Sequence, residues 1–250
     1  MIDHLDKIRS IAGSSMRAKV VTINTFPASS GIASSASGFA ALTVAAAAAL
    51  GLRESEKELS MLARLGSGSA CRSIPDGFVV WEETFAYSIF PHDRWDLRDI
   101  IVIVASDTKE ISSAAGMEQV DTSPKLASRL DAVPGRIKRA IDAIANKDIQ
   151  ALGNVTEEDC LDMHSVMQSQ TPPLDYWSEK TKEIMDAVRQ WRRGGLAAYF
   201  TIDAGPNVHV ICEGNSEQRI LDKIKEFSGV ERLIINHPAP GAHLINGHLF

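Results

Sequence analysis

Cysteine is scarce in this chain of 250 residues, which contains three. Cys71, Cys160 and Cys212 lie far apart in the sequence and form no CxxC pair. An odd and widely spaced set disfavours both a disulfide framework and a zinc site. We therefore expect three reduced thiols.

Long apolar runs and a basic excess are also missing. The richest apolar run, Phe39–Leu52, falls short of the roughly 18 residues that a membrane span needs and follows a serine cluster. The N-terminus mixes charged residues without an apolar signal core, so we expect a cytoplasmic protein that is not bound to a membrane. The net charge of -6 argues against nucleic-acid binding. An anionic ligand would have to be held by local features, namely helix N-termini and single arginines.

The composition is that of a globular protein with one large core or two modest ones. The texture becomes polar near residues 106–110, where we place a boundary between domains at 1–107 and 108–250. Strands and helices mix in both parts, which indicates an α+β fold.

In the first domain, β-branched residues predict a strand at Lys19–Asn24, and an Ala-rich stretch predicts a helix at Ser34–Leu50 that is apolar almost all round, and therefore buried, and ends at Gly51. A further helix is predicted at 54–64, with strands at 77–82 and 99–105. The second domain is predicted to contain helices at 123–146, broken near Pro134, at 177–193 and at 217–227, and strands at 197–202, 208–213 and 232–236.

The sharpest local motif is Pro27–Ala36, a Gly-containing loop after a predicted strand whose last residues open a helix with hydroxyl side chains. Free N–H groups and the positive end of the helix dipole favour a phosphate there. The plainer interpretation is N-capping by Ser34 or Ser35. The loop is neither GxxxxGK[ST] nor GxGxxG, which excludes a Walker loop and a dinucleotide fingerprint.

This loop resembles the second motif, PxxxGLxSSA, of the small-molecule kinase (GHMP) superfamily of galactokinases, homoserine kinases and mevalonate kinases, with Ile32 in place of the usual Leu. Within that superfamily the chain is similar to the diphosphomevalonate decarboxylases. Further segments carry the same resemblance in the same order: Ser67–Ser73 (SGSACRS), Ser112–Met117 with Thr122 and Ser123, and Phe200–Asn207 (FTIDAGPN).

The resemblance implies a two-domain kinase-superfamily fold, with a ribosomal-protein-S5-like N-terminal domain and a ferredoxin-like C-terminal domain. Members of the family begin with a strand and a loop bearing a KYWGK-like motif, and here Met1 lies only 25 residues before Phe26. We therefore expect an incomplete N-terminal domain. An incomplete sheet would leave unpaired edges, so we expect self-association as a homodimer.

The resemblance also implies a reaction. The family uses ATP to phosphorylate the 3-hydroxyl of mevalonate 5-diphosphate, which then loses phosphate and carbon dioxide. Asp203 is the expected catalytic base, and Arg72 is expected to pair with the substrate carboxylate. Mg²⁺ is expected with ATP, but the sequence does not identify its ligands. The expected substrate-binding residues are Ser67, Gly68, Ser69, Ala70, Cys71, Arg72, Ser37 and Thr122, and the expected ATP and phosphate contacts are Gly31, Ala33, Ser34 and Ser35.

Other interpretations stay open at the level of sequence. A relative that decarboxylates the monophosphate, or a mevalonate 3-kinase, would share the phosphate loop, and a non-catalytic fragment or binding subunit would need no turnover. Singly, Arg72 could be a surface arginine, Asp203 a turn former, and His164 and His243 solvated or core histidines. Their joint occurrence with the phosphate loop favours the enzyme.

Overall fold

The computed structural model describes residues 1–26, 34–104, 116, 118–247 and 249, which form two compact units. The first unit comprises the described parts of residues 1–28, 33–94 and 238–250. The second comprises the described parts of residues 95–237. Within the described residues, no helix combines the length and the apolar character needed to cross a membrane.

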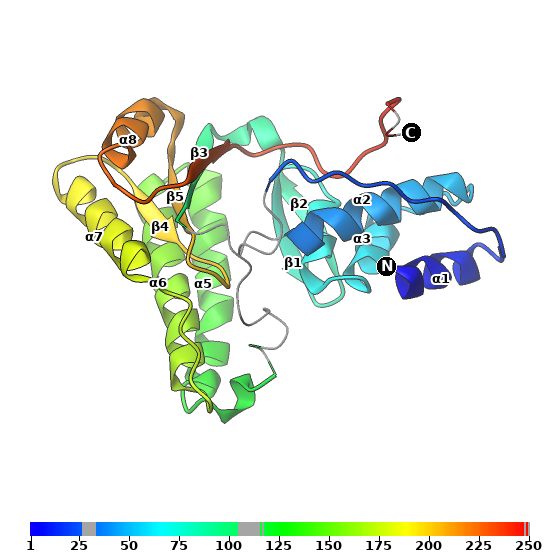
Figure 1. Cartoon of the computed structure of the whole chain (residues 1–250), viewed down its shortest axis with the longest axis horizontal. Coiled ribbons are helices and arrows are strands. Elements are labelled where there is room, and N and C mark those ends of the chain that lie inside the picture. Colours follow the sequence, from blue (N-terminus) through cyan, green and yellow to red (C-terminus); the bar gives the residue numbers. More distant parts are fainter. Residues whose placement is uncertain (27–33, 105–115, 117, 248, 250) are drawn as a thin grey trace. The chain divides into compact units, whose positions relative to one another are not determined.

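The first unit packs three helices and a β-hairpin around a small core. Helices α2 and α3 contact the 3₁₀ segment η1, and α3 also contacts β2 (Figure 1). The core contains Ala40, Ala63, Ala70 and Ile74. The elements are α1 (Ile2–Ile11), α2 (Ser34–Ala49), α3 (Glu56–Arg64), η1 (Gly68–Ser73), β1 (Phe78–Glu82), β2 (Phe85–Phe90) and η2 (His92–Arg94).

Local sequence signals set the ends of these helices. Beyond the end of α2, Gly51 has a φ of +72°, a conformation that glycine adopts without strain. Helix α3 begins with a capping box, in which the Ser55 hydroxyl accepts from the Glu58 N–H and the Glu58 carboxylate accepts from the Ser55 N–H. These signals set the end of α2 and the start of α3, the two helices that pack against η1.

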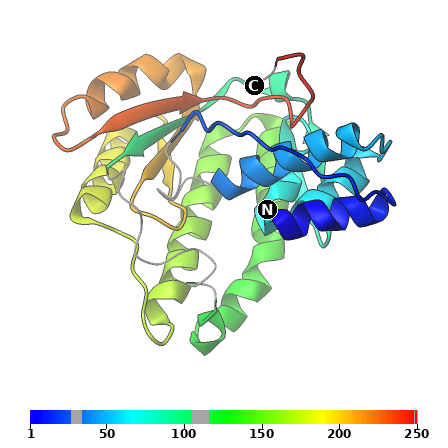
Figure 2. The same cartoon turned by 45° about the vertical axis from the view of Figure 1, so that its right-hand side comes forward.

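The second unit is a four-stranded antiparallel sheet in the order β4-β5-β3-β6. Figure 2 shows β6 alongside β3. The chain order is strand, helices, strand, strand, helix, strand, so the expected ferredoxin-like arrangement is present. The elements are β3 (Leu97–Ile103), η3 (Val120–Thr122), α5 (Leu126–Asn146), α6 (Ile149–Ser169), α7 (Glu179–Arg193), β4 (Tyr199–Thr201), β5 (Val208–Glu213), η4 (Gly214–Ser216), α8 (Glu217–Ile224) and β6 (Arg232–Asn236).

Alternate residues of the central strands build the core of the second unit. Ile100 and Val102 of β3 and Val210 of β5 are fully buried and belong to one cluster with residues of α7 and α8, such as Ile184 and Ile220. Helices α5 and α6 form a hairpin beside this core (Figure 1). Because successive strand residues point to opposite faces, this alternation places α7 and α8 on one face of the sheet.

Most predicted elements are confirmed within a few residues: α2, α3, α7, α8, β1, β3, β4, β5 and β6. The strand predicted at Lys19–Asn24 is wrong, because these residues belong to no strand of the described chain. A β-branched run becomes a strand only where a partner and an apolar surface receive it. The hairpin strand β2 and the helices α1 and α6 were not predicted.

Two helical expectations need correction. Helix α5 runs unbroken through Pro134. The carbonyl freed by Pro134 is that of Leu130, a residue that is 61% exposed, so water can bind it. Helix α2 is buried on one face only, since Ala41, Ala45 and Ala48 are exposed. Exposed alanines cost a helix little, so the apolar composition did not require burial.

The strand predicted at 99–105 was assigned to the first domain, and the structure instead places β3 at the centre of the sheet in the second unit. Conversely, the segment from Pro238 onward, which was assigned to the second domain, belongs to the first unit. A strand buried on both faces does not reveal in its own sequence which sheet it joins, because only its long-range partners decide that.

Candidate active site

The start of α2 and the loop before Arg72 meet in the first unit. The Ser35 and Ser67 hydroxyl oxygens lie 3.2 Å apart, although 32 positions separate the residues in sequence. The Ser37 hydroxyl turns back and donates to the Ser34 carbonyl at 3.0 Å. Two predicted serine clusters therefore face each other. The other predicted phosphate contacts, Gly31 and Ala33, lie outside the described residues.

The start of α2 has the electrostatic character of an anion-binding site. Helix α2 has 16 residues, and its first turn contains no acidic side chain. The first N–H groups, which have no partner within the helix itself, and the positive end of the helix dipole are therefore not neutralised by a carboxylate of the same turn. The exposed Ser35 adds a hydroxyl that can donate to a phosphate oxygen.

Buried hydrogen bonds hold the loop that contains Ser67. The Ser60 hydroxyl donates to the Cys71 carbonyl at 2.9 Å and accepts from the Ala86 N–H of β2, also at 2.9 Å. The Cys71 thiol donates to the Gly68 carbonyl at 3.1 Å. Burial raises the pKa of the Cys71 thiol, so the sulfur stays protonated and acts as a donor. The loop is thus fixed from its buried side while Gly68 stays exposed.

Arg72 follows directly and is exposed. It lines a cavity of about 400 Å³ together with Ser37, Ser73 and the segment from Ala239 to Ala242. Among the described residues its guanidinium forms no hydrogen bond or ion pair, and it lies over the Trp81 ring, 5.6 Å from the ring centroid. An unpaired guanidinium at a cavity can bind a carboxylate in two-pronged fashion.

Three hydrogen bonds, two between backbone groups and one to a side chain, hold the C-terminal side of this cavity in place. The Gly77 N–H donates to the Ala239 carbonyl at 3.0 Å, and the Ala242 N–H donates to the Ser73 carbonyl at 2.9 Å. The Asp76 carboxylate accepts from the Gly241 N–H at 2.6 Å. The sequence did not indicate that residues so far from Arg72 would form one wall of its cavity.

Asp203 lies in the second unit, exposed, two positions after the end of β4. Side chains of α6 fix the preceding peptide, since His164 Nε2 lies 3.1 Å from the Ile202 carbonyl oxygen and the Ile202 N–H donates to the Cys160 sulfur at 3.2 Å. On the other side of the turn, the Thr181 hydroxyl donates to the Pro206 carbonyl at 2.6 Å. The Asp203 backbone is therefore held from both ends.

Burial sets the protonation of these α6 side chains. His164 is fully buried, and burial lowers its pKa, so its imidazole is neutral near pH 7. A carbonyl oxygen only accepts, so the proton lies on Nε2. Burial raises the pKa of the Cys160 thiol to about 11. Both groups therefore act as neutral hydrogen-bonding partners of the Ile202 peptide.

Some of the other residues singled out by the motifs already use their polar groups in hydrogen bonds within the protein, and some are buried. The Thr122 hydroxyl donates to the Gln119 carbonyl at 2.6 Å and accepts from the Thr171 N–H at 2.7 Å, so the fold already uses it. Asn207, the last residue of the DAGPN segment, accepts from the Val104 N–H at 2.9 Å. Ala70 and Cys71 are buried, so a ligand could meet only their backbone.

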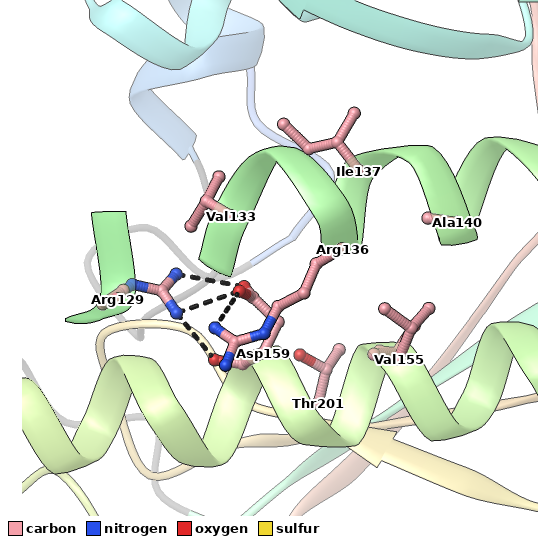
Figure 3. Close-up of a pocket in the computed structure, with 9 residues that line it drawn as sticks. Arg129, Val133, Arg136, Ile137, Ala140, Val155, Asp159 and Thr201 are labelled. Carbon is pink, nitrogen blue, oxygen red and sulfur yellow. Dashed lines mark hydrogen bonds and ion pairs between the residues drawn. The ribbon is translucent and has the colours of Figure 1, made fainter. Parts of the chain in front are cut away.

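A second cavity, of about 290 Å³, lies between α5 and α6 and holds two arginines. Figure 3 shows the Arg129 and Arg136 guanidinium groups directed at Asp159. Both also bond Asp162, at 3.0 and 2.5 Å. Because carboxylates neutralise both guanidinium groups, this cavity lacks the free positive charge that an anion needs.

Within the described part of the chain, no group of three or more His, Cys, Asp or Glu side chains could hold a metal ion, and the three cysteines are free and buried. A magnesium ion at the start of α2 would therefore take its ligands from phosphate oxygens, water and a serine hydroxyl such as Ser35. This donor set suits Mg²⁺, which usually keeps waters and binds substrate phosphates.

The structure brings Ser35 to Ser67 and places Ser37 and Arg72 at one cavity. Arg72 and Asp203 belong to different units. That both act on one substrate, as the resemblance implies, stays a prediction. The Glu157 carboxylate also accepts from the Phe200 N–H of β4 at 3.1 Å. The supporting residues Glu157, Cys160 and His164 were not predicted to serve the site. Their spacing of three and four positions, which puts them on one face of a helix, is the signal that could have indicated them.

Two family models match the chain. The diphosphomevalonate decarboxylase-like N-terminal domain matches residues 1–88, and the mevalonate 5-diphosphate decarboxylase C-terminal domain matches residues 99–238. A diphosphomevalonate decarboxylase of Debaryomyces hansenii is 36% identical over 231 residues, which are 86% of this chain and 60% of the relative. One of Bos taurus is 35% identical over 87% of this chain and 55% of its own length. The chain thus spans about 60% or less of these two relatives.

Solved structures resemble the chain over most of its length. The mevalonate diphosphate decarboxylase from Enterococcus faecalis, studied for its mevalonate-diphosphate-mediated ATP binding, is 37% identical, with a TM-score of 0.86 over 96% of this chain and 75% of that one. The Staphylococcus aureus enzyme is 35% identical, with a TM-score of 0.88 over 96% and 75%. A complex of MDDEF with MVAPP, AMPPCP and magnesium is 38% identical, with a TM-score of 0.88 over 96% and 76%.

Proposed function

Because the chain belongs to the diphosphomevalonate decarboxylase family, we propose that it catalyses the ATP-dependent decarboxylation of mevalonate 5-diphosphate to isopentenyl diphosphate. One observation carries the proposal. The Arg72 guanidinium, which has no hydrogen-bond or ion-pair partner among the described residues, lines a cavity with Ser37, on the same helix as Ser35, whose hydroxyl oxygen lies 3.2 Å from that of Ser67. A carboxylate and a phosphate can be held by such groups at the same time.

Arg72 would orient the carboxylate that is later lost. Its planar guanidinium stays charged at every working pH and can offer two parallel N–H donors. Ser67 and the backbone of Gly68 and Ser69 would hold substrate phosphate oxygens. Because the loop is fixed through Ser60 and Cys71, these donors would be oriented before the substrate arrives, and such preorganisation supplies much of an enzyme's rate enhancement.

The start of α2 would hold the nucleotide phosphates through Ser34, Ser35 and its free N–H groups. When bound, ATP with Mg²⁺ supplies the phosphoryl group for the tertiary hydroxyl. The bound AMPPCP and magnesium of MDDEF support this choice. The serine-rich and acid-free first turn of α2 fits such a polyanion.

Asp203 would accept the proton of the 3-hydroxyl as the phosphoryl group moves. A tertiary alcohol is a poor nucleophile, and a carboxylate within hydrogen-bond reach removes the proton that opposes attack. The contacts of Ile202 with Cys160 and His164 would keep the Asp203 backbone in one place. A cytoplasmic location and a homodimer belong to the same proposal and are supported by the sequence pattern alone.

The decisive experiment offers the purified chain ATP and Mg²⁺ with mevalonate 5-diphosphate, mevalonate 5-phosphate or mevalonate, and measures ADP and carbon dioxide. We expect both products with the diphosphate. If both products form with mevalonate 5-phosphate and not with the diphosphate, the chain is a phosphomevalonate decarboxylase. If ADP forms without carbon dioxide, the chain is a 3-kinase. If neither ADP nor carbon dioxide forms with any of the three substrates, the chain is a non-catalytic binding subunit.

A substitution at Asp203 tests the mechanism. Asp203→Asn keeps the shape and removes the proton acceptor, so turnover should fall by about 10²–10⁴-fold with little change in ATP affinity. Asp131→Asn is the matched control, because Asp131 is an exposed aspartate of α5. It should leave turnover unchanged. Near-normal turnover in Asp203→Asn would assign the base to another residue.

A further inference from the structure

Two arginines share one aromatic ring in the first unit. The guanidinium carbon of Arg64, at the end of α3, lies 5.8 Å from the centroid of the Trp81 ring, and that of Arg72 lies 5.6 Å from it. The backbone of Gly68 closes against the same indole, since a Cβ at that position would lie 3.4 Å from the Trp81 ring. The Trp81 ring therefore lies beside the beginning, the middle and the end of the loop that contains the SGSACR motif.

The ring itself is held in place. Trp81 lies on β1, where it is paired with Ala86 of β2. Its indole N–H donates to the Glu83 carbonyl in the hairpin turn at 3.1 Å. The side chain is 37% exposed, so one part of the indole remains available to ligands and to the arginines. A rigid aromatic face with few rotatable bonds is a suitable support for a flexible arginine.

Both guanidinium groups carry charge that the described protein does not neutralise. Neither Arg64 nor Arg72 forms a hydrogen bond or ion pair with the residues that the structure describes, and Arg64 Nε is buried without a partner. In the second unit, by contrast, Arg129 and Arg136 each bond two aspartates. Two unneutralised cations beside one ring create a local positive field despite the net charge of -6.

We propose that Trp81 is a positioning residue, whose indole holds Arg72 toward the carboxylate of a mevalonate phosphate, and that Arg64 is a second cation on the same ring that strengthens the field at this carboxylate. The inference rests on the proposed function. It assigns to the β-hairpin a role in substrate binding, because two guanidinium groups at this position favour a substrate that carries a carboxylate there.

The test compares Trp81→Leu, which removes the aromatic face, with Trp81→Phe, which keeps one. Loss of a cation–π contact corresponds to about a 2- to 30-fold change in an equilibrium constant. We expect the dissociation constant of mevalonate 5-diphosphate to rise within this range in Trp81→Leu and to recover mostly in Trp81→Phe. Arg64→Gln should also weaken this binding. The dissociation constant of an ATP analogue, measured by calorimetry in the same variants, should change less than twofold.

The matched control is Tyr87→Leu, which removes a similarly exposed aromatic side chain from the same hairpin, 38% exposed on β2. It should leave the affinity for mevalonate 5-diphosphate unchanged. If Tyr87→Leu weakens binding as much as Trp81→Leu does, the effect comes from the stability of the hairpin, and the positioning role is overturned. Equal affinity in the wild type and Trp81→Leu would overturn it too.

A second measurement is independent of substrate. Protons of a guanidinium group above an indole are shifted upfield by its ring current, so the Arg64 and Arg72 Nε–H signals should lie upfield and return to ordinary positions in Trp81→Leu. If the Arg64 and Arg72 Nε–H signals do not differ between the wild type and Trp81→Leu, the two arginines do not stack on Trp81. A wild-type chain with these upfield signals that binds no mevalonate phosphate would overturn the proposed function and the positioning role, while the arginine stacking would stand.

Discussion

At the scale of single residues, three side chains of α6 take the place of a neighbouring strand. Sheet order makes β4 an edge strand. The Glu157 carboxylate accepts from the Phe200 N–H at 3.1 Å, and Cys160 and His164 bond the two groups of the Ile202 peptide. A free edge normally exposes such groups to water or to another chain. Here side chains of α6 form hydrogen bonds with these backbone groups of Phe200 and Ile202, and the backbone that leads to Asp203 is thereby held in one position.

Removing the His164 donor should therefore weaken the second unit. In His164→Leu the buried Ile202 carbonyl loses its imidazole donor, which should lower the free energy of unfolding by about 1–3 kcal/mol, as measured by urea denaturation. His164→Asn retains an N–H donor and should lose less. His237→Leu alters an exposed histidine and should stay within about 0.5 kcal/mol of the wild type. Equal stability of His164→Leu and the wild type would show that this hydrogen bond is dispensable.

A second residue-scale prediction concerns His209, whose Nδ1 lies 3.0 and 3.1 Å from the two Asp99 carboxylate oxygens. Burial lowers the pKa of His209, but the hydrogen bond and charge of Asp99 outweigh it, so the pKa is raised above 6.5. A titration of the His209 ring signals by NMR should give this raised pKa. Asp99→Asn removes the charge of Asp99 and leaves burial, which lowers the pKa, and the charge of Asp203, which raises it, so the pKa of His209 should fall below that of the wild type.

The same shift has a defined effect on stability. Because the folded-state pKa is raised, the contribution of the pair is complete below about pH 6.5 and is lost as the pH rises through the folded-state pKa. The difference in unfolding free energy between wild type and Asp99→Asn should therefore shrink between pH 6 and pH 9. His4 and His164, whose pKa values are lowered by burial, are present in both proteins and cancel in this difference. A difference that grows with pH would contradict the pairing.

At the scale of elements, the sequence predicted those helices and strands that have a clear apolar pattern or clear turn residues at their ends. The amphipathic helices α7 and α8 and the strand β5 were found because their apolar spacing is regular, and β3 because its apolar run is continuous. Helix α6 was missed since the face it turns to β4 carries Gly153, Glu157, Cys160 and His164, which weakens the apolar pattern. The motifs identified Ser35 and Ser67 as candidate ligand contacts, and the structure brings their hydroxyl oxygens to 3.2 Å. The support from Trp81 depends instead on long-range packing that no local pattern shows.

The contact between α6 and β4 depends on a glycine. A Cβ at Gly153 would overlap the Tyr199 ring, which is 3% exposed and has little room to move. Gly153→Ala should therefore lower the unfolding free energy by about 1–3 kcal/mol despite its gain in helix propensity. Gly135→Ala in α5 is the matched control, because no atom lies within 4 Å of its Cβ. That variant should be stabilised by up to about 1 kcal/mol, and both changes can be followed by circular dichroism in urea.

At the scale of the whole molecule, the chain leaves the first unit after Arg94 and re-enters it at Pro238. The returning segment is held by the Asp76 carboxylate on the Gly241 N–H and by backbone bonds of Ser73 and Gly77. The Arg72 cavity is therefore built from two parts of the chain that are joined by the entire second unit. A substitution that loosens the segment from Pro238 onward should therefore destabilise the Arg72 cavity and leave the four-stranded sheet of the second unit unchanged.

Asp76→Ala tests this arrangement. Loss of the carboxylate should speed the amide exchange of Gly241, Gly77 and Ala242, while the amides of β4 and β5 keep their protection. Asp93→Ala, at an exposed aspartate of η2, should leave the exchange of all of these amides unchanged. If Asp76→Ala also accelerates exchange in β4 and β5, the two units do not open independently.

The return of Pro238 to the first unit also sets the order of events during synthesis on the ribosome. A chain normally completes its N-terminal domain first as it emerges. Here the wall formed by Ala239 to Ala242 is translated after all of 95–237. The Ser73–Gly77 segment of the nascent chain therefore lacks these partners while the second unit is translated, so the first unit is completed only after the second. During that interval the unfinished first unit is the one exposed to chaperones and proteases.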